Sequence, residues 1–559
     1  MDKIIECVPN FSEGRDRTVI DAITSKLDGL DSVVLLDVDP GEATNRTVVT
    51  FIGSPEGVKE GAFQVVKAAS ELIDMRNHSG AHARMGATDV CPFVPVSGVT
   101  MEDCIDIAKE VGGRIGKKLG IPIYLYEKAA SREEWQNLAT VRSGEYEGLK
   151  DKLKDSNWKP DFGPAKFNAK SGATAVGARE FLIAYNVNLN TKNRKLASDI
   201  ALDIREQGRA KRDSEGKIIR DKDGKMVKVP GKLKECKAVG WVIEEYQKAQ
   251  VSINLTNYHV TPPHVVFETI REEARKRGLR VTGSEIVGLI PLEAMLEAGK
   301  YYIQKQGGTL GVPELEFVRT AIESLGLNEV AAFDPHEKII EYRVKTPREL
   351  MSIKVDEFTD ELSSDSPAPG GGSISALAGS LAGALVSMVA ALTHGKKGME
   401  ELKPEMEEIG TTAQNLKDRL SFLVDDDTRA FNDVMTGMRM KKKTDEQKEV
   451  RKNAIEEATK KATEVPLEVA ELCFDVLKLS KIVVEKGNPN SVSDAGVAAE
   501  SALTGVRGAR LNVLINLSGI EDDAFCNSMK QKVNDLEFES VMLRDKVAVL
   551  VEEVIQENG

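Results

Sequence analysis

Cysteine, histidine and aromatic residues are all scarce in this chain. Its 559 residues include six cysteines, six histidines and three tryptophans, and aromatic residues make up 5% of the total. The cysteines are scattered, without the close pairs that mark zinc or redox motifs. Scattered cysteines in so large a chain are typical of a reducing compartment, and the first residues lack the pattern of a secretion signal. We therefore expect a cytoplasmic protein.

An excess of positive charge is also lacking. The formal net charge is -13, which argues against a protein that holds nucleic acid phosphates without regard to sequence. With 41% hydrophobic and 30% charged residues, the composition is typical of folded domains in water. The chain is too long for one hydrophobic core, so we expect several packing units.

Long apolar runs are rare, and one stands out. Residues 374–392 carry no charge, and Gly379 and Gly383 form a G-x-x-x-G pattern. Alanine, glycine and serine dominate this run, so its transfer into lipid is only weakly favourable. We expect a buried helix of a bundle here and no membrane span.

Hydrophobic periodicity divides the chain into a mixed part and a helical part. In the mixed part, short β-branched runs alternate with helical patterns, and its second half loosely repeats the first. The predicted fold is multidomain: two related α/β (α+β) sandwich subdomains with external helices, followed by an all-α antiparallel helical bundle. We place the subdomains at 1–178 and 179–335, a linker at 336–350 and the bundle at 351–559.

Two of the six histidines lie four residues apart in a glycine-containing loop. His78 and His82 are followed by Arg84 and then by an apolar strand, so a loop presents a titratable ring beside a cation. This makes His82 a candidate general acid/base. The pattern leaves two alternatives open: a metal site formed by both histidines, for which no third ligand is evident, and a purely structural histidine.

Two features of the helical part could carry chemistry. Residues 367–373 read Pro-Ala-Pro-Gly-Gly-Gly-Ser and enter a helix, where free backbone N–H groups suit an anion or a carbonyl; the alternative is an ordinary linker. Asp425, Asp426 and Asp427 are consecutive on a predicted helix, so they point in different directions. A carboxylate that faced the bundle interior would have a raised pKa and could move protons, whereas a solvated acidic turn would not.

Three further polar segments are predicted to lie outside the cores. Residues 208–230 form a long charged hairpin with Asp223 and Gly224 at a turn. Lys441 to Lys443 are expected to form a solvated loop or, alternatively, a site for a polyanionic substrate tail. Residues 487–494 form a polar loop that could cap the bundle or line a pocket.

Several of these segments resemble a known enzyme family. The segments Ile5-Glu-Cys-Val-Pro-Asn-Phe-Ser-Glu-Gly14, Asn45-Arg46-Thr47, His82-Ala-Arg-Met-Gly-Ala and Asp89-Val-Cys-Pro-Phe93 closely resemble glutamate formimidoyltransferase. In the helical part, Ala368-Pro-Gly-Gly-Gly-Ser373, the run from Leu423 to Phe431 and Asn512-Val-Leu-Ile-Asn516 resemble formimidoyltetrahydrofolate cyclodeaminase. The order of the two parts is similar to that of the bifunctional formimidoyltransferase-cyclodeaminase family, and the likeness covers nearly the whole chain.

The resemblance implies two reactions on one folate, as a step of histidine degradation. The formimino group of N-formimino-L-glutamate passes to N5 of tetrahydrofolate; N10 then attacks the same carbon and ammonia leaves, giving 5,10-methenyltetrahydrofolate. In the family, His82 corresponds to the transferase acid/base and Asp427 to the cyclodeaminase aspartate. From local position we add Asp39 as the partner of His82, Arg84 as the ligand of a substrate carboxylate, and Asn10 as a supporting residue.

The resemblance also implies two binding sites. The expected folate-binding segment matches the family at its ends and comprises Gly163, Pro164, Ala165, Lys166, Phe167, Asn168, Ala169, Lys170, Ser171 and Gly172. The expected cyclodeaminase pocket comprises Gly370, Gly371, Gly372, Ser373, Asn490 and Asp494.

Tetrahydrofolate in polyglutamylated form is the implied co-substrate, with no metal. The implied assembly is a homo-oligomer built from dimers, such as an octameric ring, and the 208–230 hairpin is longer than the usual family pattern. Two alternatives remain: the bundle is a methenyltetrahydrofolate cyclohydrolase, or the chain is a non-catalytic folate-binding scaffold. Ammonia release and turnover distinguish them.

Overall fold

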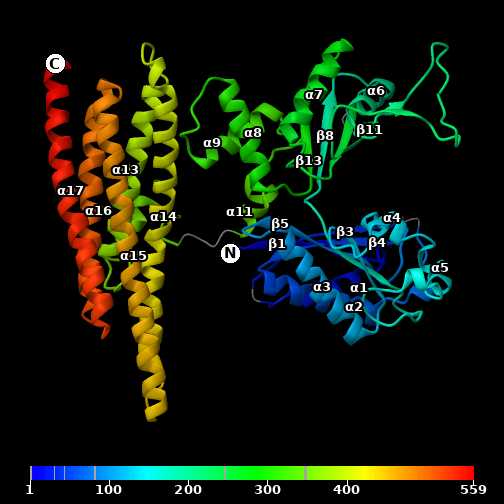
Figure 1. The fold of residues 1–559 in the computed structure, drawn as a ribbon, viewed down its shortest axis with the longest axis horizontal. Coiled ribbons are helices and arrows are strands. Elements are labelled where there is room, and N and C mark those ends of the chain that lie inside the picture. The colour runs from blue at the N-terminus through cyan, green and yellow to red at the C-terminus, as the bar shows by residue number, and fades with distance from the viewer. Residues whose placement is uncertain are drawn as a thin grey trace. The chain divides into compact units, whose positions relative to one another are not determined.

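The computed structural model describes residues 3–30, 32–42, 44–80, 83–243, 247–344 and 349–558, so His82 lies outside the described residues. The chain divides into two compact units. One unit comprises residues 1–295 and 322–346, and the other comprises residues 296–321 and 347–559 (Figure 1).

A seven-stranded mixed sheet forms the first subdomain. Its strands are β1 (Ile4–Cys7), β2 (Asn10–Phe11), β3 (Val33–Gly41), β4 (Arg46–Gly53), β5 (Thr88–Ser97), β6 (Ile123–Glu127) and β7 (Thr174–Ala178). Strands β5, β7 and β6 lie next to one another in this order and pair in parallel. Strands β1 and β2 both lie between β4 and β5, and β3 pairs with β4 at the edge. These pairings are antiparallel. The alternating βα order of the sequence therefore produces one sheet.

The two faces of this sheet differ because successive side chains of a strand point in opposite directions. Ile5, Cys7 and Phe51 belong to the core under the helices α1 (Arg17–Thr24), α2 (Pro55–Leu72) and α3 (Met101–Leu119). Part of the opposite face, on β6 and β7, packs against Trp135 and the short helices α4 (Leu138–Val141) and α5 (Glu145–Lys152). The rest of that face, on β1 to β4, carries polar side chains.

A second, smaller sheet follows, as predicted. It has the antiparallel order β11 (Cys236–Ile243), β12 (Lys248–Leu255), β8 (Ile183–Leu189) and β13 (Val281–Val287), with helices α6 (Arg194–Ile204) and α7 (Pro263–Lys276). The charged hairpin between these elements is tied at its base by β9 (Arg209–Ala210) and β10 (Lys228–Val229). Helices α10 (Pro335–Lys338) and α11 (Ile340–Val344) close the unit.

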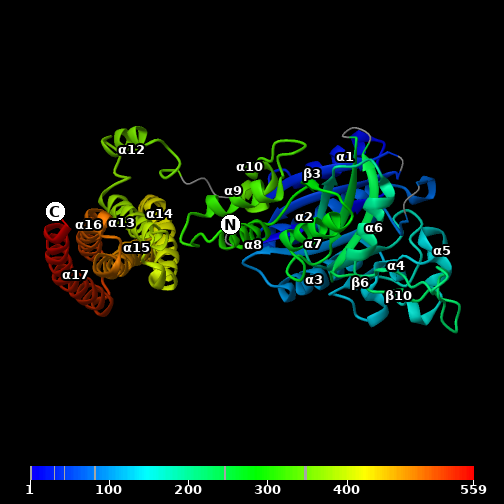
Figure 2. The same ribbon diagram turned by 90° about the horizontal axis from the view of Figure 1, so that it is seen from above.

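Long helices make up the other unit, as the helical period predicts. They are α13 (Gly371–His394), α14 (Lys403–Arg439), α15 (Asp445–Lys486), α16 (Val492–Leu517) and α17 (Asp523–Asn558), and the short helix α12 (Val355–Leu362) precedes them. Helix α12 lies beside the long helices of its unit (Figure 2), and its Phe358 is buried in their hydrophobic core.

The helical unit also includes a segment that we expected to belong to the second subdomain. Residues 296–321, with most of α8 (Leu292–Lys305) and α9 (Glu314–Leu325), group with the bundle although we placed the subdomain boundary at 335. A close glycine contact joins this segment to the bundle: a Cβ on Gly311 would lie 2.8 Å from Gly410 Cα, and the hydroxyl of Ser387 donates to the Gly311 carbonyl at 3.2 Å.

The small-residue helix α13 lies within the bundle. Of the helices in the described residues, it alone is long and apolar enough to cross a membrane. Its small side chains have another explanation, because a Cβ on Gly379 would lie 2.3 Å from Cys473 Sγ on α15. Close packing against its neighbours thus requires the glycines, in agreement with the prediction of a buried bundle helix.

Candidate functional sites

The polar face of the first sheet collects charged residues from three strands. Asp39 is exposed on β3, and Arg46, on β4, donates through Nη2 to the Asn10 side chain. Arg46 Nε is buried and has no hydrogen-bond partner among the described residues. Burial lowers the pKa of Arg46, and the nearby Asp89 and Asp39 oppose that shift. Arg46 is therefore a half-buried cation with an unused donor, and no local pattern indicated it as a site residue.

A cavity of about 540 Å³ borders the same face. Its lining includes Glu6, Asp37 and Thr50 from the first sheet and Arg179 and Lys338 from the rest of the unit. Asp37 precedes Asp39 by two residues on β3, so both point to this face. Burial raises the pKa of Glu6 to about 7 against the opposing effect of Arg179. The face thus offers both charge signs beside an open volume.

His78 has a structural role in the loop. Its Nε2 lies 2.9 Å from the Asn45 carbonyl, and its Nδ1 accepts from Arg84 Nε at 3.2 Å. Because a carbonyl only accepts, we assign the proton to Nε2, which leaves Nδ1 as the acceptor. Both ring nitrogens are engaged, so His78 is not available for the alternative metal site.

Arg84 is placed differently from our expectation. It is 8% exposed, and its guanidinium binds Glu145 at 3.0 Å and Glu147 at 2.6 Å. These carboxylates, together with His78, occupy the donors that we assigned to a substrate carboxylate. Sequence position alone did not reveal them, because they lie more than 60 residues away.

The expected folate-binding segment is anchored by its two terminal glycines. Gly163 and Gly172 have φ angles of +78° and +67°, and added Cβ atoms would lie 2.3 Å from the Ile121 carbonyl oxygen and 2.1 Å from that of Met85. Between them, residues 164–166 are exposed, and the Phe167 ring packs 5.5 Å from that of Tyr146. The contact with Met85 brings the segment beside residues 85 and 86.

In the bundle, the helix start of α13 holds a carboxylate from α14. Ser373 Oγ donates to Asp427 Oδ2 at 3.1 Å, and a Cβ on Gly372 would lie 2.0 Å from Asp427 Oδ1. Burial raises the pKa of Asp427, against hydrogen bonds from the Ser373 hydroxyl and backbone. The free N–H groups predicted to suit an anion therefore face the chain's own aspartate.

The other two aspartates of the triplet have different partners. Asp425 is 3% exposed and accepts from the Leu350 backbone N–H at 2.7 Å. Asp426 is half-buried and pairs with Arg429 at 3.0 Å. Of the three, Asp427 is the one beside the glycine turn.

The remaining members of the expected pocket lie elsewhere in the bundle. Asn490 is exposed in the loop where the neighbouring Asn488 donates its backbone N–H to Thr393, at the C-terminal end of α13. Asp494 lies in the first turn of α16, after that loop. The 24 residues of α13 correspond to about 36 Å of helix, so within one chain neither residue joins Asp427.

Asn512 takes a place beside the glycine turn instead. Its Nδ2 would lie 3.3 Å from a Cβ on Gly371. The Asn512–Asn516 segment resembled the family, but the pattern gave no reason to select this side chain. Its proximity comes from the antiparallel packing of α16 on α13.

Comparisons with known proteins agree with this two-part arrangement. Family profiles match residues 4–179 (Formiminotransferase domain, N-terminal subdomain), 184–345 (Formiminotransferase domain) and 354–535 (Formiminotransferase-cyclodeaminase). Formimidoyltransferase-cyclodeaminase of Dictyostelium discoideum is 46% identical over 545 residues, which cover 96% of each chain.

Two shorter relatives match one part each. Glutamate formimidoyltransferase of Streptococcus pyogenes serotype M1 is 45% identical over 304 residues, covering 54% of this chain and 94% of the relative. Methenyltetrahydrofolate cyclohydrolase of Methylorubrum extorquens is 40% identical over 193 residues, covering 34% of this chain and 93% of the relative. With both parts matched in order and over nearly its full length, the chain belongs to the formimidoyltransferase-cyclodeaminase family of bifunctional enzymes.

Proposed function

We propose that the first unit transfers the formimino group of N-formimino-L-glutamate to N5 of tetrahydrofolate. The helical unit then cyclises 5-formimidoyltetrahydrofolate to 5,10-methenyltetrahydrofolate and releases ammonia, as a step of histidine degradation. The observation that carries this proposal is the Asp427 carboxylate, held at the glycine start of α13 with a raised pKa. The transferase assignment is supported by the polar sheet face with its cavity and by the family.

In the transfer step, an amine attacks an amidine carbon and must lose a proton, while the departing glutamate nitrogen must gain one. A positioned acid/base speeds such a step by roughly 10²–10⁴-fold. We assign that role to His82, with Asp39 as its partner, on family likeness and on the exposed position of Asp39 on the polar face. The segment 163–172 provides the folate contact beside the loop.

In the cyclisation step, N10 adds to the same carbon of the protonated amidine and loses a proton; the amidine nitrogen, now an amino group, gains one proton and leaves as ammonia. One carboxyl group can accept the first proton and deliver the second. A raised pKa brings Asp427 closer to the pH at which both transfers are feasible. Ser373 keeps the carboxylate in place through its hydroxyl.

We assign the substrate carboxylate to Arg46 in place of Arg84. Replacement of Arg46 by methionine is expected to raise KM for formiminoglutamate by roughly 10- to 150-fold, because a charged hydrogen bond contributes about 1.5–3 kcal/mol. Steady-state kinetics measure the effect. The matched control is Arg84→Lys, whose partners are protein carboxylates; its main effect should be a lower melting temperature. If Arg84→Lys raised KM as strongly as Arg46→Met, the assignment would be refuted.

An absorbance assay for methenyltetrahydrofolate, coupled to detection of ammonia, tests the whole proposal. Formiminoglutamate and tetrahydrofolate should yield both products in equal amounts. A second candidate, the cyclohydrolase, is favoured by the 40% identity to the Methylorubrum extorquens protein. In that case added methenyltetrahydrofolate would be hydrolysed and no ammonia would form. Folate binding without turnover would identify a scaffold.

We further propose a cytoplasmic homo-oligomer built from dimers, with an octameric ring as one such assembly, acting on polyglutamylated folate. The basis is the family likeness together with the reduced cysteines. Sedimentation of the purified protein and comparison of mono- and polyglutamylated tetrahydrofolate as substrates test these points.

A further inference from the structure

The hairpin 208–230 contains an internal repeat of eight residues. Arg212-Asp-Ser-Glu-Gly-Lys217 and Arg220-Asp-Lys-Asp-Gly-Lys225 have the same pattern. In each copy the aspartate Oδ1 accepts two backbone N–H groups, the glycine adopts positive φ, and the arginine Nη1 donates to the glycine carbonyl. The two turns are thus closed by the same set of contacts.

A ring of backbone hydrogen bonds joins the two turns. Lys211 N donates to the Val227 carbonyl at 2.8 Å, Ile219 N to that of Lys211 at 2.8 Å, and Val227 N to that of Ile219 at 2.9 Å. The three residues are eight apart, so the repeat period generates the ring. The segment, which we call the basic arm, has a defined structure without a hydrophobic core.

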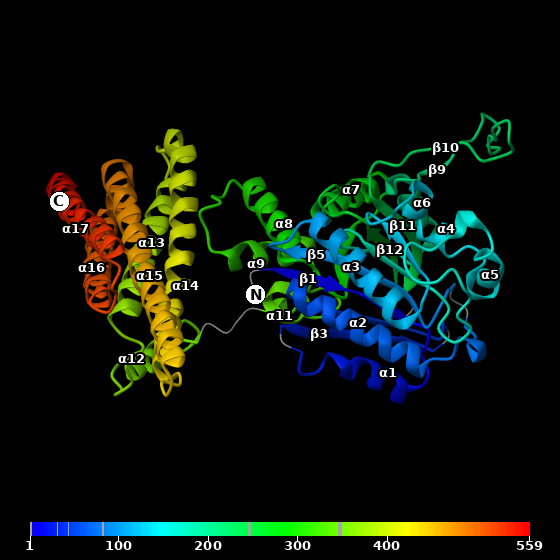
Figure 3. The ribbon, with the colours of Figure 1, turned by 60° about the horizontal axis from the view of Figure 1, so that its bottom comes forward.

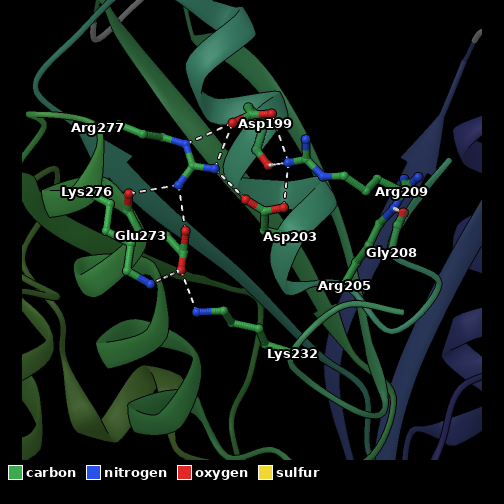
Figure 4. A network of polar contacts seen from close by, with 9 residues as sticks. All are labelled: Asp199, Asp203, Arg205, Gly208, Arg209, Lys232, Glu273, Lys276 and Arg277. Atoms are coloured by element: carbon green, nitrogen blue, oxygen red, sulfur yellow. Dashed lines mark hydrogen bonds and ion pairs between the residues drawn. The ribbon is translucent and has the colours of Figure 1, made fainter. Parts of the chain in front are cut away.

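The root of the basic arm is clamped on both sides (Figure 4). Arg209 on the outgoing strand binds Asp199 at 2.8 Å and Asp203 at 2.6 Å, both on α6. Lys232, just after the returning strand, binds the buried Glu273 of α7 at 2.5 Å. Ion pairs to two different helices hold the two sides of the root, which favours one orientation of the arm over many.

The basic arm projects from its unit into solvent (Figure 3). Residues 211–230 are exposed, apart from the half-buried Ile219 and Val227. Ile218 and Met226 are 37% and 47% exposed. Eight lysine and arginine residues face four acidic residues between 208 and 230, a net charge of +4 in a chain whose total is -13. An ordered arm that shows basic and apolar groups to water is suited to bind an acidic surface.

The chain itself carries such a surface. The segment 355–366 holds five carboxylates and no lysine or arginine, from Asp356 on α12 to Asp365 after it. All five are exposed, and Val355 beside them is 82% exposed. Carboxylates around an apolar residue complement lysines around Ile218 and Met226.

We propose that the basic arm docks on the acidic α12 segment of a second copy of this chain. Without the arm, the rest of the chain would have a net charge of -17. The positive arm is therefore complementary in charge to a second copy of the same acidic chain. The contact positions subunits and takes no part in catalysis. The docking proposal can therefore be tested independently of the proposed reactions.

Photocrosslinking in the full-length protein tests the proposal. Benzoylphenylalanine replaces Met226 in one tagged copy, which is co-expressed with a differently tagged, isotopically labelled copy. Crosslinks from Met226 to peptides within 355–366 of the other copy are expected. Crosslinks confined to one chain, or to other segments, would overturn the proposal.

Charge reversal provides the second test. Lys217→Glu with Lys225→Glu should shift the sedimentation profile toward smaller species at low salt, and Asp356→Lys with Asp360→Lys in the same chain should restore it. The matched control, Lys441→Glu with Lys442→Glu, makes the same charge change at another exposed basic loop and should leave sedimentation unaltered. An unaltered profile in the arm variant, or failure of the paired reversal to restore assembly in a protein with native circular dichroism, would refute docking on α12.

Discussion

Asp427→Asn is expected to stop ammonia release while formimino transfer continues. The amide cannot exchange a proton with N10 or with the leaving nitrogen, so the cyclisation rate should fall by roughly 10²–10⁴-fold. The intermediate 5-formimidoyltetrahydrofolate would then accumulate, as chromatography of the products can show. Asp426→Asn is the matched control, because Asp426 pairs with Arg429 away from the glycine turn; it should retain most of its activity.

The reciprocal variant separates the two sites. His82→Ala should lose transfer by a similar factor yet still cyclise 5-formimidoyltetrahydrofolate that is supplied. A single substitution that removed both activities from a folded protein would contradict two separate sites.

Asp427→Asn should also stabilise the fold. Burial raises the folded-state pKa of Asp427 above its ordinary value of 3.8, so folding favours the protonated form. The stability that protonated Asp427 contributes to the folded state is fully present below pH 3.8. It is lost as the pH rises through the folded-state pKa. The variant should therefore melt at a higher temperature than the wild type at neutral pH, with a difference that shrinks toward pH 3.8. A variant that was both inactive and less stable would point to damage of the fold instead.

Gly372→Ala is expected to lose nearly all cyclodeaminase activity. A Cβ would lie 2.0 Å from Asp427 Oδ1, which is far too close for two atoms that are not bonded. The carboxylate must therefore leave its position beside Ser373. Misplacement of a catalytic group by about 1 Å can cost roughly 10²-fold. Transferase activity, in the other unit, should remain, and the two rates measured on one preparation show the contrast.

Gly370→Ala serves as the control for this effect. The same methyl group at Gly370 would approach no closer than 3.8 Å, to the Pro367 carbonyl, and the φ of −141° suits alanine. Loss of cyclisation in both variants alike would mean that the turn requires flexibility and that the contact with Asp427 is not decisive.

Local patterns were sufficient for the architecture. Strand-length runs and helical periods predicted two sheet subdomains and a bundle, because side-chain periodicity reflects which face of each element is buried. The many small side chains in residues 374–392 likewise indicated a helix against which neighbouring helices pack closely. Residues 296–321 group with the bundle by spatial contact, although the family profile places them in the second subdomain, as the sequence predicted.

The candidate sites were predictable only in part. Motif likeness selected Asp427, but its neighbours on the helix were equally acidic, and only the packing of α13 on α14 distinguishes it from Asp425 and Asp426. Arg84 was assigned to substrate from its position near His82, whereas the fold supplies Glu145 and Glu147 as partners. Arg46 shows its unpaired Nε only in the folded sheet.

By itself, the sequence determined the family, the order of the domains and the residue types available for proton transfer, because these depend on local period and on motifs. Tertiary structure decided which of those groups meet. Gly372 and Asp427 are 55 residues apart and in contact, while Asn490 lies near the far end of α13. The physical reason is that burial, charge pairing and close approach arise from chain segments brought together by packing, and no local pattern encodes them.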